Sequence, residues 1–271
     1  MSASALRQPA LFLPHGGGPC FFMDWTWGPA DTWHATQRFL EGLAASLPAP
    51  PEALLVVSGH WEEPAFTASA ASAPQLIYDY SGFPEHTYRL TWPAPGDPAL
   101  ATRVVELLKV AGLPAATSST RGYDHGVFVP LKVAFPQAQI PVVTLSLAAS
   151  LDPAQHLAAG RALAPLRDEG VLIIGSGMSF HNLRGYLRPE TPARARAFDD
   201  WLTAAVTSPA SERNAALTRW REAPFATYAH PREEHLIPLM VVAGAGGDAP
   251  GARIFHDEPM AAALSAYRFD G

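Results

Sequence analysis

The chain has 271 residues, 48% of them hydrophobic and 16% charged, and its formal net charge at pH 7 is −6. That length and composition allow one large core, so we expect a single domain over residues 1–271. The mild acidity and the scattered Lys and Arg residues argue against a nucleic-acid partner. No apolar run reaches the roughly 18 residues that span a bilayer, so no membrane partner is expected.

The N-terminal segment and the cysteine content bear on the compartment. Residues 1–9 lack the charged, apolar and small-residue regions of a secretory signal, so we expect a cytoplasmic protein. The single cysteine, Cys20, excludes an intrachain disulfide and a multi-cysteine zinc site. A metal in this chain would therefore have to be held by histidine and carboxylate side chains.

Three apolar runs end in glycine or lead to a histidine. They are residues 11–14 with His15, residues 54–57 with His60, and residues 171–177 with His181. Such runs are typical of buried strands in an α/β sheet, whose ligands gather beyond the carboxyl ends of the strands. We expect the three strands to bring their histidines to one place.

Helical and strand patterns alternate along the rest of the chain. Helices are predicted at residues 31–46, 97–112, 129–135, 152–170, 191–206, 211–223 and 231–243, the first capped by Asp31 or Thr32. Further strands are predicted at residues 66–72, 75–79 and 140–147, with edge strands at 253–255 and 265–269; residues 25–33, 80–96 and 121–126 are predicted as loops. The alternation predicts an α/β fold, a single domain whose central mostly parallel or mixed sheet is flanked by helices.

His15 and His60 follow buried-type strands, where an imidazole needs a polar partner in a nearly dry setting. A shared metal would supply that partner, with a third ligand from elsewhere. The candidates for the third ligand are His181, His230, Glu233, Glu234 and His235. In a helix, His235 would share a face with Leu239 and Val242 and point inward. The competing interpretation is that the acidic residues here are solvated at a helix N-terminus.

Seven motifs, taken in chain order, resemble the class III extradiol ring-cleavage dioxygenases. They are His15-Gly16-Gly17-Gly18-Pro19, Ser58-Gly59-His60-Trp61-Glu62, Asp79-Tyr80-Ser81-Gly82-Phe83-Pro84, Tyr123-Asp124-His125-Gly126, Ile140-Pro141-Val142-Val143, Gly175-Ser176-Gly177 through His181-Asn182-Leu183, and Glu234-His235-Leu236-Ile237-Pro238-Leu239. The ordered set resembles most the single-chain DOPA 4,5-dioxygenase-type proteins, and it extends over nearly the whole chain.

The resemblance implies a mononuclear metal held by His15, His60 and His235. It also implies that His181 is either a further ligand or the catalytic acid/base, and that His125 lies in the site. Relatives with a separate small subunit use a carboxylate as the third ligand, so a role for Glu234 in the metal shell stays open. We expect Fe(II) to be the active metal, and Zn(II), which sits above it in the affinity order, to be able to occupy the same site.

The implied reaction is extradiol cleavage of a small-molecule catechol by O₂. His181 would act as the base, His125 would hydrogen-bond to substrate or oxygen, and Tyr123, Trp61 and Phe22 are predicted as aromatic walls. The alternatives are a zinc-dependent hydrolase and a non-catalytic metal- or ligand-binding protein on the same scaffold. A homo-oligomer is compatible with the sequence.

Overall fold

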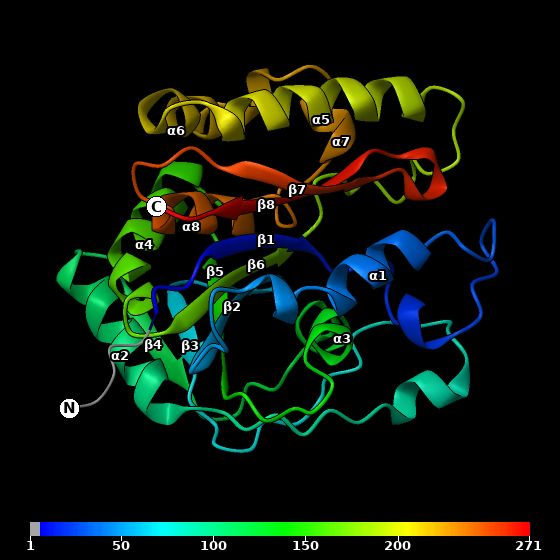
Figure 1. Cartoon of the computed structure of the whole chain (residues 1–271). Helices are drawn as coiled ribbons and strands as arrows, with labels where there is room; N and C mark the ends of the chain where they lie inside the picture. Colours follow the sequence, from blue (N-terminus) through cyan, green and yellow to red (C-terminus); the bar gives the residue numbers. More distant parts are fainter. Residues whose placement is uncertain (1–5) are drawn as a thin grey trace.

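The computed structural model describes residues 6–271. Residues 1–5, part of the N-terminal segment 1–9 that was predicted not to be a secretory signal, lie outside the described residues. Its centre is an eight-stranded sheet with the order β4-β3-β5-β2-β6-β1-β8-β7 (Figure 1). The strands are β1 (Ala10–Pro14), β2 (Ala53–Glu63), β3 (Phe66–Ser69), β4 (Ala115–Ser118), β5 (Val142–Ala148), β6 (Val171–Gly177), β7 (Ala252–Asp257) and β8 (Leu264–Phe269). Strands β5, β2, β6 and β1 are parallel, whereas the β3–β5, β1–β8 and β8–β7 pairs are antiparallel. The predicted α/β fold with a mixed sheet is confirmed.

Helices cover both faces of the sheet (Figure 1). The helices are α1 (His34–Glu41), α2 (Pro98–Val110), α3 (His125–Ala134), α4 (Pro153–Leu163), α5 (Thr191–Thr207), α6 (Ala210–Thr218), α7 (Ala226–Ala229) and α8 (Ile237–Ala245). Helices α1 and α3 share a buried cluster with one sheet face, and α2, α4, α5, α6 and α8 share one with the other. The domain is therefore a three-layer structure around one sheet.

Successive residues of the central strands point to opposite layers. In β2, Leu54 and Val56 belong to the cluster with α1 and α3, whereas Leu55 and Val57 belong to the cluster with α8. This follows from the two-residue period of a strand, and burial on both faces explains why these strands read as continuous apolar runs. Helix α8 is buried along its whole length, as expected of a helix that is apolar on every side.

Helix α3 begins at His125, so the predictions of a loop at 121–126 and a helix from 129 are wrong. Pro130 suggests a helix start, because proline lacks an N–H and fits the first turn. Here it lies inside the helix, and the Gly126 carbonyl that it leaves without a helical partner accepts a hydrogen bond from the Ser176 hydroxyl. That bond ties the start of α3 to strand β6.

Other predicted boundaries also shift. Helix α8 begins at Ile237 rather than 231, because Pro238 belongs to a first turn. Helix α1 begins at His34 with Trp33 at the N-cap position and no side-chain cap, so Asp31 and Thr32 do not cap it. Residues 75–79 form only an isolated bridge from Leu76 rather than a strand. The edge strands are β4, which the pattern did not predict, and β7, whereas β8 pairs on both sides.

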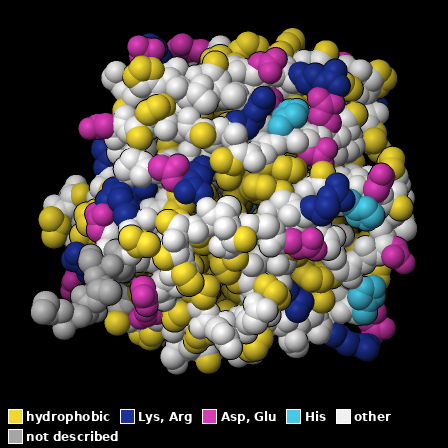
Figure 2. All heavy atoms as spheres, viewed as in Figure 1, with side chains coloured by type: hydrophobic (Ala, Val, Ile, Leu, Met, Phe, Trp, Pro, Cys, Tyr) yellow, Lys and Arg dark blue, Asp and Glu magenta, His cyan; other side chains and the backbone are white. Residues whose placement is uncertain are grey.

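The surface has no single-sign stripe on the face that Figure 2 shows, where basic and acidic side chains are interspersed. Among residues 6–271, no helix combines the length and the apolar character needed to cross a bilayer.

Candidate metal centre

Strands β1, β2 and β6 are neighbours and parallel, so their carboxyl ends meet at one edge of the sheet. His15 directly follows β1, and its N–H donates to the Gly177 carbonyl at the end of β6, at 3.2 Å. His60 lies within β2 rather than after it, because β2 continues to Glu63 after a register shift against β5. His181 lies in a short loop after β6. The predicted gathering of these histidines is confirmed.

A fourth histidine, His235, joins them from the turn before α8. Its carbonyl accepts a hydrogen bond from the Met178 N–H at 3.0 Å, just beyond β6. A Cβ atom at Gly177 would lie 2.1 Å from that carbonyl oxygen, so only glycine allows this approach. His235 therefore reaches the strand ends through a turn and not, as predicted, through a helix face.

Three imidazole Nε2 atoms converge on one point. The Nε2 atom of His60 lies 3.3 Å from that of His15 and 3.1 Å from that of His235. The Nδ1 atoms of His15 and His235 have other partners, the Gly16 carbonyl at 2.8 Å and the Glu234 carboxylate at 2.9 Å. Because those partners only accept, Nδ1 carries the proton and Nε2 carries a lone pair.

Burial keeps these imidazoles neutral. Desolvation, and after it the neighbouring histidines, lower the pKa of His15 and His235 well below the usual value and the pKa of His60 to about 3. Neutral acceptor nitrogens about 3 Å apart cannot satisfy one another by hydrogen bonds. A divalent cation that accepts all three lone pairs resolves the conflict, and the donor set fits such an ion.

Asp79 positions two of the site histidines. One of its oxygens accepts hydrogen bonds from the backbone N–H of His125 at 2.9 Å and from Nδ1 of His125 at 2.8 Å, and the other lies 3.6 Å from Nδ1 of His60. Burial alone would raise the pKa of Asp79, but the hydrogen bonds and charge of His125 hold it at about 2. The spacing in the sequence carried no signal for this residue beyond its place in the Asp79–Pro84 motif.

Glu234 does the same for His181 and His235. Its Oε1 accepts from Nδ1 of His235 at 2.9 Å and lies 3.5 Å from Nδ1 of His181, whose ring stacks on His235 with centroids 3.5 Å apart. Burial raises the pKa of Glu234, but the interaction with His181, a backbone hydrogen bond and the charge of Arg232 together outweigh it, so the net shift is downward. The carboxylate thus faces Nδ1 atoms, away from the point where the Nε2 atoms converge.

Two further groups of possible ligand atoms exist among the described residues, one around Asp79 and one around Glu234. Both consist of a carboxylate beside the Nδ1 atoms of two histidines, and hydrogen bonding accounts for them without a metal. The convergence of His15, His60 and His235 has no such explanation, which favours it as the metal centre.

The wall behind His60 is built by the start of α3. A Cβ atom at Gly126 would lie 2.7 Å from Cδ2 of the His60 ring, so the ring and the helix are in direct contact. Asp124, fully buried, accepts a hydrogen bond from the Ser58 hydroxyl at 2.8 Å and from Arg121 at 2.6 Å. These contacts fix β2 against α3 next to His60.

A cavity of about 550 Å³ opens beside the convergent histidines. His15, His60, His125 and His181 line it. Its aromatic walls are Trp25, Trp27, Trp33, Tyr80, Phe83 and Tyr186. Four of the histidines therefore face a space large enough for a small aromatic molecule.

The aromatic residues predicted as walls lie elsewhere. Tyr123 is fully buried, and its hydroxyl donates to two backbone carbonyls at 3.1 and 3.0 Å. Trp61 packs beneath Arg121, whose guanidinium lies 4.9 Å from the ring centroid, and Phe22 packs against Lys132. None of the three lines the cavity, whose walls come from other residues before α1, from residues after Asp79 and from the segment after β6.

Two other candidate ligands are engaged outside the site. His230 is buried, and its Nε2 lies 3.0 Å from the Ser179 carbonyl. Glu233 pairs with Arg221 at 2.6 Å. Neither reaches the convergence point of the Nε2 atoms.

Known proteins share both the sequence and the fold. Residues 9–266 match the family described as the catalytic LigB subunit of aromatic ring-opening dioxygenase. The 4,5-DOPA dioxygenase extradiol of Beta vulgaris is 40% identical over 82% of this chain and 84% of its own length. The protein of that name from Escherichia coli K12 is 36% identical over 89% and 86%, and dioxygenase tasH of Hapsidospora irregularis is 36% identical over 97% and 86%.

The crystal structure of uncharacterized protein JW3007 from Escherichia coli K12 aligns with a TM-score of 0.79 and 31% identity, covering 97% of this chain and all of that one. Sequence and structure therefore agree along nearly the whole chain. The chain belongs to the LigB family of aromatic ring-opening dioxygenases and is an extradiol ring-cleaving dioxygenase, as its motifs predicted.

Proposed function

We propose that the protein is a mononuclear Fe(II) dioxygenase that opens the ring of a catechol next to the diol. The observation that carries the proposal is the convergence of three neutral Nε2 lone pairs from His15, His60 and His235 beside the cavity. These three imidazoles would hold the ion and would leave coordination positions for substrate and dioxygen, as the ligand sets of non-haem iron oxygenases do. When bound, iron supplies the Lewis-acid and redox chemistry that joins a catechol to dioxygen.

His181 is the proposed acid/base. Glu234 lies beside its Nδ1, which leaves Nε2 free toward the cavity that His181 lines. An imidazole in this position can accept the proton that the diol must release and return it to the opened product. Stacking on His235 holds the His181 ring in place. The Glu234 carboxylate lies beside Nδ1 of both rings and so favours the Nδ1-protonated tautomer of each.

His125 is proposed to orient the oxygens. Because its Nδ1–H donates to Asp79, its Nε2 is directed to the cavity, where it can form a hydrogen bond with a substrate oxygen. The overall reaction breaks the ring carbon–carbon bond next to the diol, and both atoms of O₂ enter the product. The names of the relatives assign DOPA to those proteins; for this chain the proposed substrate class is catechols.

Zn(II) can occupy the same three imidazoles, since it sits above Fe(II) in the usual affinity order. Purified protein containing zinc is therefore compatible with an iron enzyme. The hydrolase and binding-protein alternatives are not favoured, because the family match concerns ring-opening dioxygenases.

The test is oxygen uptake together with absorbance of the ring-opened product after anaerobic Fe(II) loading, with DOPA, caffeate and protocatechuate. We expect uptake matched to product with Fe(II) and none with Zn(II). His60→Ala should lose both bound iron and turnover, whereas His34→Ala, which removes an exposed imidazole on α1, should retain both. Iron-loaded protein without uptake on any catechol would refute the proposal.

A further inference from the structure

The cavity beside the histidines is apolar over the rest of its wall. Among the described residues, its lining includes no Lys, Arg, Asp or Glu. The other described lining residues are histidines, glycines, aromatic residues, Leu and Met, with Ser81 as the one exception. A charged group on a substrate would therefore find no countercharge in this wall.

Three of the polar groups in the aromatic wall are already engaged, whereas the indole N–H of Trp33, an uncharged donor, is buried without a hydrogen-bond partner among the described residues. The hydroxyls of Tyr80 and Tyr186 and the indole N–H of Trp25 donate to backbone carbonyls at 2.6, 3.2 and 3.1 Å. Burial raises the pKa of Tyr80 to about 12, so its phenol stays neutral. These side chains present ring faces rather than hydrogen-bonding groups to the cavity.

The apolar wall continues out to the mouth. Trp27, Leu183 and Leu187 are 53%, 73% and 62% exposed, and they are three of the six large hydrophobic side chains that residues 6–271 leave exposed. All three line this cavity. Trp27 is held by Phe83, with ring centroids 5.3 Å apart. Apolar surface gathered around one opening is typical of a ligand-binding site.

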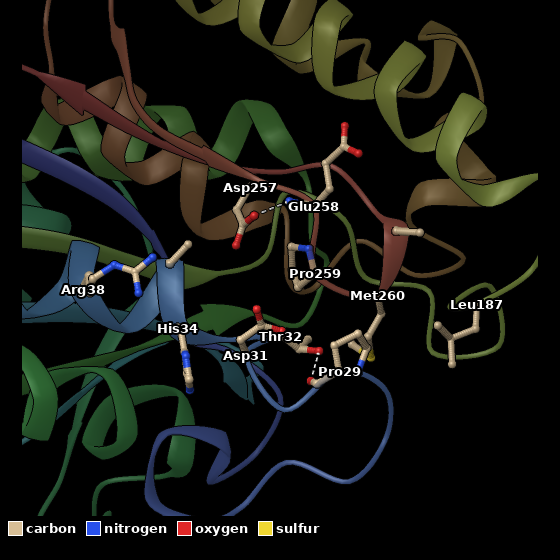
Figure 3. A pocket seen from close by; sticks show the side chains of 12 residues that line it. Pro29, Asp31, Thr32, His34, Arg38, Leu187, Asp257, Glu258, Pro259 and Met260 are labelled. Carbon is tan, nitrogen blue, oxygen red and sulfur yellow. Dashed lines mark hydrogen bonds between the residues drawn. The ribbon is translucent and has the colours of Figure 1, made fainter.

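Charged residues lie in a neighbouring hollow (Figure 3). Asp31, Arg38 and Asp257 line this second space of about 530 Å³. Leu187 and Met260 belong to the walls of both spaces and stand between them. Arg184 and Arg188 neighbour the mouth leucines in sequence but do not line the cavity.

We propose that the protein selects catechols whose ring substituent is uncharged and apolar, and that it discriminates against carboxylate and amino-acid side chains. The inference rests on the catechol dioxygenase activity proposed above. With the diol at the histidines, the substituent extends toward Trp27, Phe83, Leu183 and Leu187. Placing an unpaired charge against this apolar wall is unfavourable, because the wall displaces part of the hydration of the charge, whereas each methylene placed there is favourable.

The test compares catechols of matched shape. The substituents are 3-methylbutyl, the isosteric propanoate, the methyl ester of that propanoate, and the alanyl group of DOPA. We expect kcat/KM to be at least about tenfold higher for the 3-methylbutyl compound than for the propanoate. Along the 4-methyl, 4-ethyl and 4-propyl series, kcat/KM should rise by up to about fourfold per methylene. Equal or higher kcat/KM for the propanoate or DOPA would overturn the inference.

Binding separates this inference from the proposed activity. Dissociation constants are measured on metal-free protein by quenching of tryptophan fluorescence, and the same order of affinities is expected without turnover. If that order holds but no ring opens, the activity proposal fails and the selectivity stands. If rings open but the propanoate binds as tightly as the 3-methylbutyl compound, the selectivity alone fails.

Variants at the mouth give an independent reading. Leu183→Arg should raise kcat/KM for the propanoate relative to the 3-methylbutyl compound by about tenfold, because it supplies the missing countercharge. Val110→Arg, at an 89% exposed position on α2, is the matched control and should leave the ratio unchanged. Arg184→Gln with Arg188→Gln should also leave it unchanged. A selective loss of propanoate turnover in that double variant, or no shift in Leu183→Arg, would contradict the proposal.

Discussion

The carboxylate of Glu234 accepts a hydrogen bond from Nδ1 of His235 at 2.9 Å and thereby turns the Nε2 lone pair of that ring toward His60. Asp79 stands in a similar relation to His60 and His125. Each of the two carboxylates thus connects one convergent histidine with one histidine that lines the cavity. Losing either carboxylate should therefore affect both metal affinity and proton transfer.

Replacing Glu234 tests this coupling. Glu234→Gln keeps the shape but removes the charge that favours the Nδ1-protonated ring, so iron affinity should fall by about 10- to 100-fold. Chelator competition under anaerobic conditions measures the change. Glu233→Gln is the matched control, because that carboxylate pairs with Arg221 instead. Equal affinity in the two variants would show that Glu234 does not tune the centre.

Alanine variants of His181 and His235 should distinguish loss of catalysis from loss of metal binding. His181→Ala is expected to lower kcat by about 10²- to 10⁴-fold, the usual contribution of a general acid/base, with most iron retained. His235→Ala is expected to lose the iron itself. Metal content by elemental analysis, alongside oxygen uptake, distinguishes the two. Loss of iron from His181→Ala would instead show that His181 is primarily a metal ligand.

Gly126 should be intolerant of a side chain. In Gly126→Ala the new methyl would lie 2.7 Å from the His60 ring and push it away from His15 and His235. We expect iron affinity to fall by at least about tenfold, since the geometry of the donor set decides binding. Gly42→Ala, at the end of α1, places its Cβ in ordinary contact at 3.6 Å and should bind iron normally.

His156 should make stability depend on pH. Burial lowers its pKa from 6.5 to about 4, because its Nε2 accepts the Ala148 N–H inside the fold and its protonated form would be desolvated. The unfolded chain binds the proton more readily, so stability is fully present above pH 6.5 and is lost as the pH falls toward 4. The free energy of unfolding should fall by about 2 kcal/mol from this residue between pH 7 and pH 5.

Denaturant unfolding of His156→Gln and of wild type at both pH values measures that contribution. The variant should be less stable at pH 7 but should lose less stability on acidification. His34→Gln, an exposed position, should follow the wild-type pH dependence. An unchanged pH dependence in His156→Gln would assign the acid sensitivity to other histidines.

The sheet and two of the converging histidines were predictable from the sequence. Continuous apolar runs before His15 and His60 identify strands buried on both faces, and parallel neighbours place their ends together. His235 was one of five candidates for the third ligand, and the helix face that it was expected to share was wrong, because its turn depends on a close contact with Gly177 that no periodicity encodes. Asp79 was missed for the same reason: its contact with His125 is tertiary.

The aromatic walls were mispredicted for a different reason. Tyr123 is adjacent in sequence to the site motif, yet α3 begins at His125 and turns the preceding residue pair into the core. Trp25, Trp27 and Trp33, which do line the cavity, belong to the aromatic segment 25–33 that was predicted as a loop over the site, but the pattern did not identify these side chains as its walls. Proximity along the chain is a weak guide where a helix starts within the motif.

The three convergent imidazoles are far apart along the chain: 45 residues separate His15 from His60, and 175 separate His60 from His235. A ribosome that has synthesised β1 and β2 has therefore exposed only two of the three nitrogens. The third follows after the helices that precede α8 have been made. A nascent chain that ends before α8 consequently lacks the full donor set, so complete iron binding has to wait until His235 has been synthesised, late in translation or after it.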